Sequence, residues 1–290
     1  MNESGAVALV TGGAKRIGRA IVEDLCAHGF AVAVHSNSSL AQADELVANI
    51  VGQGRRASAF KADLTDTDQT KKLLEDVTTA MGPVQLLINN ASLFKNDSLP
   101  DCDGPDCDGP DCDGPDCDGP DIDRSDFGGD DFFKKLDLGG QDWDDHFSVH
   151  VKAPVLLAQG MARNLPANAE GLVVNMIDQR VWRLTPRYFS YTLSKSALWT
   201  ATRTMAQALA PKIRVNAIGP GPTLRNMRQD EDDFRQQVDA LLLQRGPDLS
   251  EFGATIRYLW QARSVTGQMI ALDGGQHLAW KTPDIAGVLE

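Results

Sequence analysis

The sequence predicts a doubly wound α/β domain in which helices cover both faces of a seven-stranded parallel sheet. Short apolar segments with strand character alternate along the chain with longer segments of helical period, which is the pattern of repeated βαβ units. A glycine-rich turn also lies between the first predicted strand and the first predicted helix. Because domains of the Rossmann type carry such a turn at their dinucleotide site, we expect a single domain of this type.

The predicted strands and helices follow from the spacing of apolar residues. Strands are expected where short apolar runs end at polar or turn residues, namely residues 6–11, 30–35, 56–61, 85–89, 172–177, 213–217 and 269–272. Apolar residues at helical spacing predict helices at residues 15–28 and 41–52, and another helix that begins near Gln141. The seven strands account for the predicted sheet.

One acidic segment departs from this pattern. Residues 101–120 repeat the pentapeptide Asp-Cys-Asp-Gly-Pro four times, and 13 of the 40 acidic residues lie at positions 101–131 beside a single arginine. A Gly-Pro pair every five residues excludes helix, and the repeat has little apolar surface to bury. We therefore expect residues 1–290 to form one domain that contains residues 100–140 as an extended, mobile low-complexity insertion loop.

Composition and charge argue against several classes of function. The net charge of −12 belongs to the acidic segment, so the neutral remainder gives no reason to expect nucleic acid or an anionic membrane as partner. Without an apolar run of membrane-spanning length or a basic leader, we expect a cytoplasmic protein that acts on a small molecule. The cysteine spacing suits neither disulfides nor zinc, and no glutamate completes a calcium loop, so no metal is expected.

The glycine turn is the first candidate binding site. Missing side chains at Gly12 and Gly18 let the backbone approach a pyrophosphate, whose charge the helix N-terminus favours. Lys15, Arg16 and Ile17 complete this turn. An ordinary strand-to-helix turn without a ligand has a similar pattern, because loose glycine patterns are common.

The end of the second predicted strand bears on the choice of dinucleotide. It reads His35-Ser36-Asn37-Ser38, with no Asp or Glu where an NAD enzyme holds the ribose 2′-hydroxyl. Arg16 and the polar groups of this segment could surround a 2′-phosphate, since a guanidinium matches phosphate geometry. The segment therefore favours NADPH/NADP+, although a solvated arginine beside a polar loop would have the same residues.

Tyr191 and Lys195 are four residues apart, so a helix places them on one face. A tyrosine whose pKa is about 10 holds its proton at neutral pH, and a nearby cation lowers that pKa. We therefore expect Tyr191 to be a proton donor and Lys195 to make it a stronger acid. When such spacing stands alone, the edge of an amphipathic helix is its more frequent explanation.

These motifs together resemble those of the classical short-chain dehydrogenases. The glycine turn, Asn89-Asn90-Ala91, the Tyr191 and Lys195 pair and Pro220-Gly221 occur in the order and spacing of that superfamily. Within it, the chain resembles the pteridine reductases and dihydromonapterin reductase-like members most. The shared features are Gly-Ala-Lys-Arg in the first turn, Asn-Asn-Ala-Ser after the fourth strand and an Asp on the fifth strand.

The resemblance implies further cofactor contacts. In chain order these are Asp63, Leu64, Asn89, Ala91, Tyr191, Lys195, Pro220 and Gly221. Asp63 and Leu64 would flank the adenine, Asn89 and Ala91 would line the ribose and phosphate region, and Lys195 would bind the nicotinamide ribose. Asp63 also suits a turn or a helix N-cap, and the two roles are compatible.

The resemblance also implies a substrate site made of Ser92, Phe94, Asp178, Tyr191 and Thr223. Pteridine reductases have Asp where most of the superfamily has serine, and a carboxylate can accept hydrogen bonds from the amino and ring N–H groups of a pterin. Phe94 matches the ring that stacks on the pterin. The ordinary alternatives are core packing for Phe94 and a solvated strand end for Asp178.

His150 departs from the superfamily pattern. An asparagine usually occupies this position and helps to hold a water that links the lysine to solvent. A neutral imidazole could serve the same relay through its two nitrogens, which gives His150 an expected catalytic role. Alternatively, His150 is a buried residue with satisfied partners and the relay is altered.

The sequence thus predicts an NADPH-dependent reductase that transfers hydride to a dihydropterin-like substrate, with Tyr191 as proton donor. The resemblance further implies a homotetramer. Two alternatives use the same residues. One is a general carbonyl or 3-oxoacyl reductase of the same fold, and the other is a non-catalytic nucleotide-binding protein whose acidic insertion binds a partner.

Overall fold

The computed structural model describes residues 5–94, 141–185, 188–225 and 230–281, which contain the seven strands of one parallel sheet. The strands are β1 (Val7–Val10), β2 (Ala31–Ser36), β3 (Ala57–Lys61), β4 (Val84–Asn89), β5 (Gly171–Met176), β6 (Ile213–Pro220) and β7 (Met269–Leu272). Their order across the sheet is β3-β2-β1-β4-β5-β6-β7, which confirms the predicted doubly wound fold. The order reverses between β1 and β4, and folds of this class bind ligands at that point.

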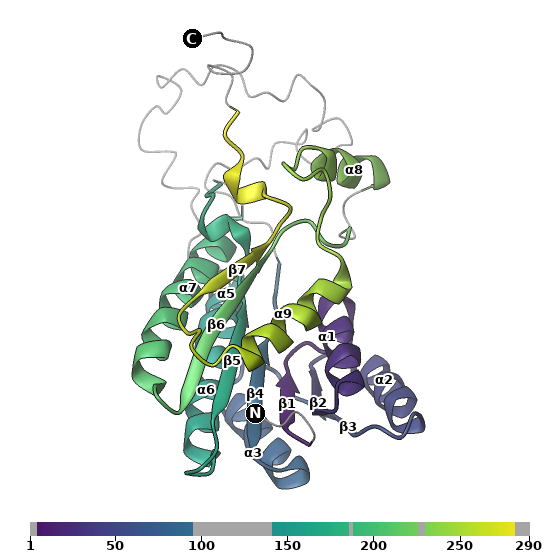
Figure 1. Cartoon of the computed structure of the whole chain (residues 1–290), viewed down its shortest axis with the longest axis vertical. Coiled ribbons are helices and arrows are strands. Elements are labelled where there is room, and N and C mark those ends of the chain that lie inside the picture. The colour runs from purple at the N-terminus through teal and green to yellow at the C-terminus, as the bar shows by residue number, and fades with distance from the viewer. Residues whose placement is uncertain (1–4, 95–140, 186–187, 226–229, 282–290) are drawn as a thin grey trace.

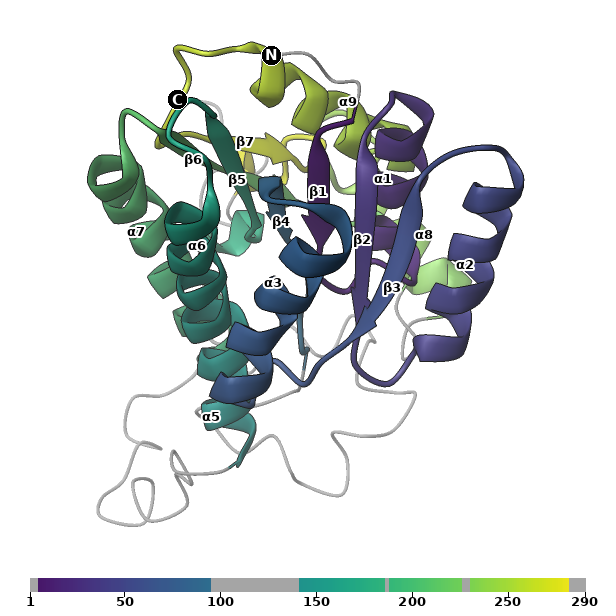
Figure 2. The same ribbon diagram turned by 90° about the horizontal axis from the view of Figure 1, so that it is seen from below.

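Helices cover both faces of the sheet, as Figures 1 and 2 show. They are α1 (Arg16–Ala27), α2 (Leu40–Gly52), α3 (Thr67–Met81), α5 (Gln141–Phe147), α6 (Ala153–Asn164), α7 (Phe189–Leu209), α8 (Glu231–Asp239) and α9 (Leu249–Gln261). Three short turns are η2 (Ser148–Lys152), η3 (Gln179–Val181) and η4 (Gln276–Leu278). Helices α1, α2 and α9 bury one apolar cluster against the sheet, and α3, α6 and α7 bury the other.

Side chains alternate between these two clusters along each strand. In β1, Ala8 and Val10 belong to the cluster under α1, whereas Val7 and Leu9 belong to the cluster under α3. A slip of one residue in strand pairing would exchange the two sets. Because both faces are covered, the strands form continuous apolar runs in the sequence.

The starts of the helices differ in a way that matters for binding. The Asp66 side chain caps α3 by accepting hydrogen bonds from the backbone N–H groups of Asp68 and Gln69, and Asp248 with Glu251 forms a capping box on α9. In contrast, α1 follows the glycine turn directly, and its N-cap residue Lys15 makes no side-chain cap. The first N–H groups of α1 are therefore suited to bind an anion.

The observed elements match the predicted ranges to within a few residues. The largest difference is β6, which continues to Pro220 and so carries the strand into the Pro220-Gly221 motif. The acidic repeat and the other residues of the predicted insertion up to residue 140 lie outside the described residues. Within the described part of the chain, no helix is both long and apolar enough to span a membrane.

Candidate active site

A cavity of about 760 Å³ lies where β1, β4, β5 and β6 end. The predicted site residues that line it are Arg16, Ile17, Ser92, Phe94, Asp178, Tyr191, Lys195, Pro220, Gly221 and Thr223. The predicted residues outside its lining are Gly12, Lys15, Gly18, His35, Ser36, Asn37, Asp63, Leu64, Asn89, Ala91 and His150. The structure therefore gathers the predicted substrate residues around one cavity.

The glycine turn is tightly packed against the end of β4. Gly12 has φ +63°, and a Cβ atom on Gly18 would lie 2.2 Å from the Gly12 carbonyl oxygen. Asn90 holds the turn, because its Nδ2 donates to the carbonyl oxygens of Thr11 and Gly12 at 2.9 and 3.1 Å. The Ala91 N–H donates to Thr11 Oγ1 at 3.0 Å. Gly18 is thus required for the contact between α1 and the turn.

His35 supports this turn from the end of β2. The Gly12 N–H donates to His35 Nδ1 at 3.1 Å, so the ring proton lies on Nε2 and donates to the Ala62 carbonyl oxygen at 3.1 Å. Burial lowers the pKa of His35, which favours the neutral ring. Both nitrogens are bonded to the protein, so His35 shapes the cofactor site and has no free ring N–H for the cofactor.

The neighbouring Ser36 fits a phosphorylated ribose. Its hydroxyl is buried and has no hydrogen-bond partner among the described residues, and an unpaired buried hydroxyl is unfavourable. Asn37 follows in an exposed position. A 2′-phosphate at this strand end would accept the Ser36 hydrogen bond, so the residues present fit NADP.

Arg16 contacts the loop after β6. Its guanidinium donates hydrogen bonds to the carbonyl oxygens of Leu224 and Arg225, both at 3.0 Å. It therefore connects the glycine turn to the loop after β6. The expectation that Arg16 and the His35 to Ser38 segment together surround a 2′-phosphate stays a prediction.

Two other predicted cofactor residues have structural contacts. Asp63 Oδ1 accepts hydrogen bonds from the Thr65 N–H at 2.9 Å and the Thr65 hydroxyl at 2.8 Å, so Asp63 forms a turn before α3. Leu64 is buried next to it.

In β4, Asn89 Nδ2 donates to Asn175 Oδ1 at 2.7 Å, and this contact connects β4 to β5. Asn90 lines the cavity and Asn89 does not, and a contact of Asn89 with the cofactor stays a prediction.

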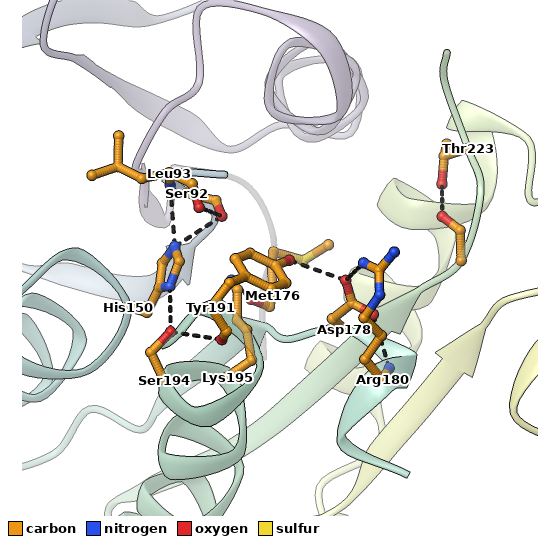
Figure 3. A network of polar contacts seen from close by, with 11 residues as sticks. Ser92, Leu93, His150, Met176, Asp178, Arg180, Tyr191, Ser194, Lys195 and Thr223 are labelled. Carbon is orange, nitrogen blue, oxygen red and sulfur yellow. Dashed lines mark hydrogen bonds and ion pairs between the residues drawn. The ribbon is translucent and has the colours of Figure 1, made fainter. Parts of the chain in front are cut away.

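Tyr191, Lys195 and Asp178 form the centre of the cavity (Figure 3). The Tyr191 hydroxyl donates to Asp178 Oδ2 at 3.0 Å. Lys195 Nζ donates to the carbonyl oxygen of Met176, at the end of β5, at 2.9 Å. The ammonium lies 5.6 Å from the centroid of the Tyr191 ring. The helix thus presents both side chains to the same place, as their spacing predicts.

The pKa values of this pair differ from the expectation. Burial and the Asp178 carboxylate raise the pKa of Tyr191 well above its ordinary value. Burial lowers the pKa of Lys195 to about 8. In this arrangement burial and the anion bonded to the hydroxyl favour the protonated phenol, and the effect of Lys195 on the acidity of Tyr191 stays a prediction.

Phe94 and Tyr188 form an aromatic wall beside Asp178. Their ring centroids are 4.4 Å apart, and Phe94 meets the Tyr191 ring edge to face at 4.9 Å. Phe94 is 39% exposed, which argues against the alternative of core packing. The Arg180 guanidinium lies 5.7 Å from the Phe94 centroid and 5.3 Å from the Tyr188 centroid. A flat ring could stack on this wall.

His150 lies in the π-helical turn η2, and both of its ring nitrogens bond to the protein. Nε2 accepts from the Leu93 N–H at 3.1 Å and lies 2.9 Å from Ser92 Oγ. The proton is therefore on Nδ1 and donates to Ser194 Oγ at 2.8 Å. Burial and Lys195 lower the pKa of His150 well below its ordinary value. His150 is therefore a buried histidine whose ring nitrogens both have partners, and its role in a proton relay stays a prediction.

The loop after β6 closes the cavity on another side. A Cβ atom on Gly221 would lie 2.6 Å from the Cα of Asp273, so only glycine allows this close approach. Thr223 Oγ1 donates to the Gly221 carbonyl oxygen at 3.1 Å. Pro220 and Thr223 both line the cavity, as the resemblance implies.

Among the lining residues that the sequence did not predict are Asn90, Arg180, Arg183 and Tyr188. Tyr188 precedes Tyr191 by three residues, and helical spacing could have indicated a shared face. Arg180 follows Asp178 by two residues, which is close enough for a local ion pair. Nothing in the local sequence marks Arg183.

Family models match most of the chain. A short-chain dehydrogenase model matches residues 6–108, and a model described as enoyl-(acyl carrier protein) reductase matches residues 132–277. The chain is 31% identical to an L-xylulose reductase of Bos taurus, with 94% of this chain and 96% of that protein covered. It is 25% identical to a 3-oxoacyl-[acyl-carrier-protein] reductase FabG of Staphylococcus epidermidis, with 96% and 100% covered.

Solved structures include more similar proteins. The chain is 49% identical to FolM alternative dihydrofolate reductase 1 from Brucella canis complexed with NADP, with 99% of this chain and 100% of that chain covered and a TM-score of 0.82. It is 51% identical to the corresponding protein from Brucella suis in complex with NADP, with 98% and 100% covered and the same TM-score.

Proposed function

This chain belongs to the short-chain dehydrogenase/reductase superfamily, and on that premise we propose that it is an NADPH-dependent reductase of dihydropterins in which Tyr191 donates the proton. The observation that carries the proposal is the hydrogen bond of 3.0 Å between the Tyr191 hydroxyl and Asp178. It places a proton donor and a hydrogen-bond acceptor side by side in the cavity.

Asp178 favours a pterin over a simple ketone. Its carboxylate accepts hydrogen bonds from the Tyr191 hydroxyl and from the backbone N–H and the guanidinium of Arg180. A carboxylate that only accepts suits the amino and ring N–H groups of a pterin, whereas a ketone oxygen needs donors. Phe94 and Tyr188 add an aromatic wall for a flat ring.

NADPH, when bound, supplies the hydride from C4 of its nicotinamide. The glycine turn and the N-terminus of α1 would hold its pyrophosphate, Ser36 its 2′-phosphate and Lys195 its nicotinamide ribose. Tyr191 would give its proton to the substrate nitrogen next to the carbon that is reduced, so that a C=N bond becomes CH–NH. The raised pKa keeps Tyr191 protonated until that nitrogen becomes basic.

The similar proteins from two Brucella species support this assignment, because both carry the name dihydrofolate reductase and both were crystallised with NADP. The 3-oxoacyl reductase relative is less similar, at 25% identity. A cytoplasmic location and a homotetramer are part of the same proposal, and the homotetramer rests on the resemblance to the family.

The test compares substrates and two matched tyrosine variants. We expect the wild type to oxidise NADPH faster with 7,8-dihydrofolate or 7,8-dihydromonapterin than with a 3-oxoacyl thioester. Tyr191→Phe should lower kcat/KM by about 10²- to 10⁴-fold, the usual contribution of a positioned acid. Tyr258→Phe, on the exposed side of α9, should leave kcat/KM unchanged. A ketone reduced faster than any dihydropterin would overturn the substrate assignment, and an active Tyr191→Phe enzyme would overturn the role of Tyr191.

A further inference from the structure

The charges that line the cavity are unbalanced. Among the described residues, four cationic side chains and one anionic side chain line it, namely Arg16, Arg180, Arg183, Lys195 and Asp178. Arg16 and Lys195 belong to the proposed cofactor contacts. Arg180 and Arg183 follow β5 and have no part in the cofactor contacts. In the part of the cavity left for the substrate, two guanidinium groups therefore accompany one carboxylate, that of Asp178.

Arg180 is bonded to Asp178, which is the carboxylate that binds the substrate in the proposed function. Its Nη1 lies 3.1 Å from Asp178 Oδ2, and its backbone N–H donates to Asp178 Oδ1 at 2.8 Å. Only 23% of the Arg180 side chain is exposed. A pterin N–H that bonds to Asp178 competes with this guanidinium, and a half-buried cation that loses its carboxylate needs another anion.

Arg183 offers a second guanidinium without a carboxylate partner in the described part of the chain. Its Nη1 lies 3.5 Å from the carbonyl oxygen of Gln276, which is the long limit of a hydrogen bond. The side chain is exposed and lines the cavity. Guanidinium groups bind carboxylates through two parallel hydrogen bonds, so this position suits an anionic group of a ligand.

We propose that Arg180 and Arg183 form a carboxylate subsite that binds the side chain of an anionic dihydropterin, such as the glutamate-bearing tail of dihydrofolate. The inference rests on the proposed function and names the part of the substrate that these residues recognise. A substrate with its own carboxylate replaces the anion that Arg180 loses at Asp178. A neutral pterin leaves that cation uncompensated.

The test measures steady-state kinetics with saturating NADPH on 7,8-dihydrofolate and on the neutral 7,8-dihydromonapterin. In Arg183→Gln, the ratio of kcat/KM for dihydrofolate to that for dihydromonapterin should fall about fivefold, the size expected for a partly exposed ion pair. Arg183→Lys keeps the charge but not the two parallel hydrogen bonds, so its ratio should lie between those of the wild type and Arg183→Gln. Arg163→Gln, an exposed arginine near the far end of α6, should leave the ratio unchanged.

Salt gives a second readout that does not need a variant. Raising NaCl from 50 to 300 mM should increase KM for dihydrofolate more than KM for dihydromonapterin, because salt screens the ion pair. Equal effects of Arg183→Gln on both pterins, or equal effects of salt, would overturn the subsite while the reductase proposal stands. If the wild type reduces neither pterin with NADPH, the proposed function fails and the subsite fails with it.

Discussion

Lys195 holds an ammonium group at a position where only 2% of the residue is exposed to solvent. Burial favours the neutral amine, so the pKa of Lys195 falls to about 8, while nearby Asp178 acts in the opposite direction. At pH 7 the group is therefore mostly protonated, and it loses its charge as the pH rises through 8. The Tyr191 hydroxyl keeps its proton over the same range because its pKa is raised.

We expect the affinity for NADPH to decrease as Lys195 loses its proton. Between pH 7 and pH 9.5, Kd should increase about tenfold, since a hydrogen bond from a charged donor contributes about 1.5–3 kcal/mol. Fluorescence titration of NADPH measures this change. Lys195→Met should bind NADPH weakly at both pH values, and Lys72→Met, at an exposed ion pair on α3, should behave like the wild type. A wild-type Kd that is flat up to pH 9.5 would contradict the assignment.

At the scale of the element, the start of α1 depends on a close backbone contact. The helix has no side-chain cap, and it packs on the glycine turn through Gly18. A Cβ at this position would lie 2.2 Å from the Gly12 carbonyl oxygen and 2.6 Å from Asn90 Nδ2. The carbonyl belongs to the backbone and cannot rotate away as a side chain does.

Gly18→Ala should therefore displace the turn or the first residues of α1. We expect a loss of about 1–3 kcal/mol in the free energy of unfolding, as is usual for overpacking, and at least a tenfold weaker NADPH affinity. Gly52→Ala is the matched control, because no atom lies within 4 Å of a Cβ there. It should keep the wild-type affinity. Denaturant unfolding and NADPH titration measure both quantities, and an unchanged affinity in Gly18→Ala would contradict this view of the turn.

At the scale of the whole molecule, the described residues already contain a continuous sheet with both faces covered. The two family matches extend to residue 108 and resume at residue 132, so neither covers the centre of the acidic segment. This supports the proposal that the chain is one domain with an insertion. Residues 101–131, with 13 Asp and one Arg, account for the net charge of −12.

Deletion of residues 101–120 tests this proposal. We expect the free energy of unfolding to change by no more than about 0.5 kcal/mol, because closure entropy depends only weakly on the length of a connection. The kcat/KM for the best substrate should stay within about twofold of the wild type. Denaturant unfolding and NADPH oxidation are the measurements, and deletion of residues 101–110 is the intermediate control. Loss of folded protein or of activity would show that the repeat belongs to the domain.

Local patterns in the sequence determined the architecture and the identity of several central residues. Alternating apolar runs predicted the seven strands, because a strand buried on both faces needs apolar residues throughout. The glycine turn was predicted because only glycine permits that backbone approach. The spacing of Tyr191 and Lys195 placed them on one face because helix geometry repeats every 3.6 residues.

Only the tertiary structure decided what these side chains contact. His150 Nε2 bonds to Leu93, 57 residues earlier, and Nδ1 bonds to Ser194, 44 residues later, so the sequence could not show that both ring nitrogens are occupied. The pKa of Tyr191 rises because the fold brings Asp178 to its hydroxyl, whereas helical spacing pointed to Lys195. Electrostatic effects depend on distance in space and on burial, and neither is written in the separation of residues along the chain.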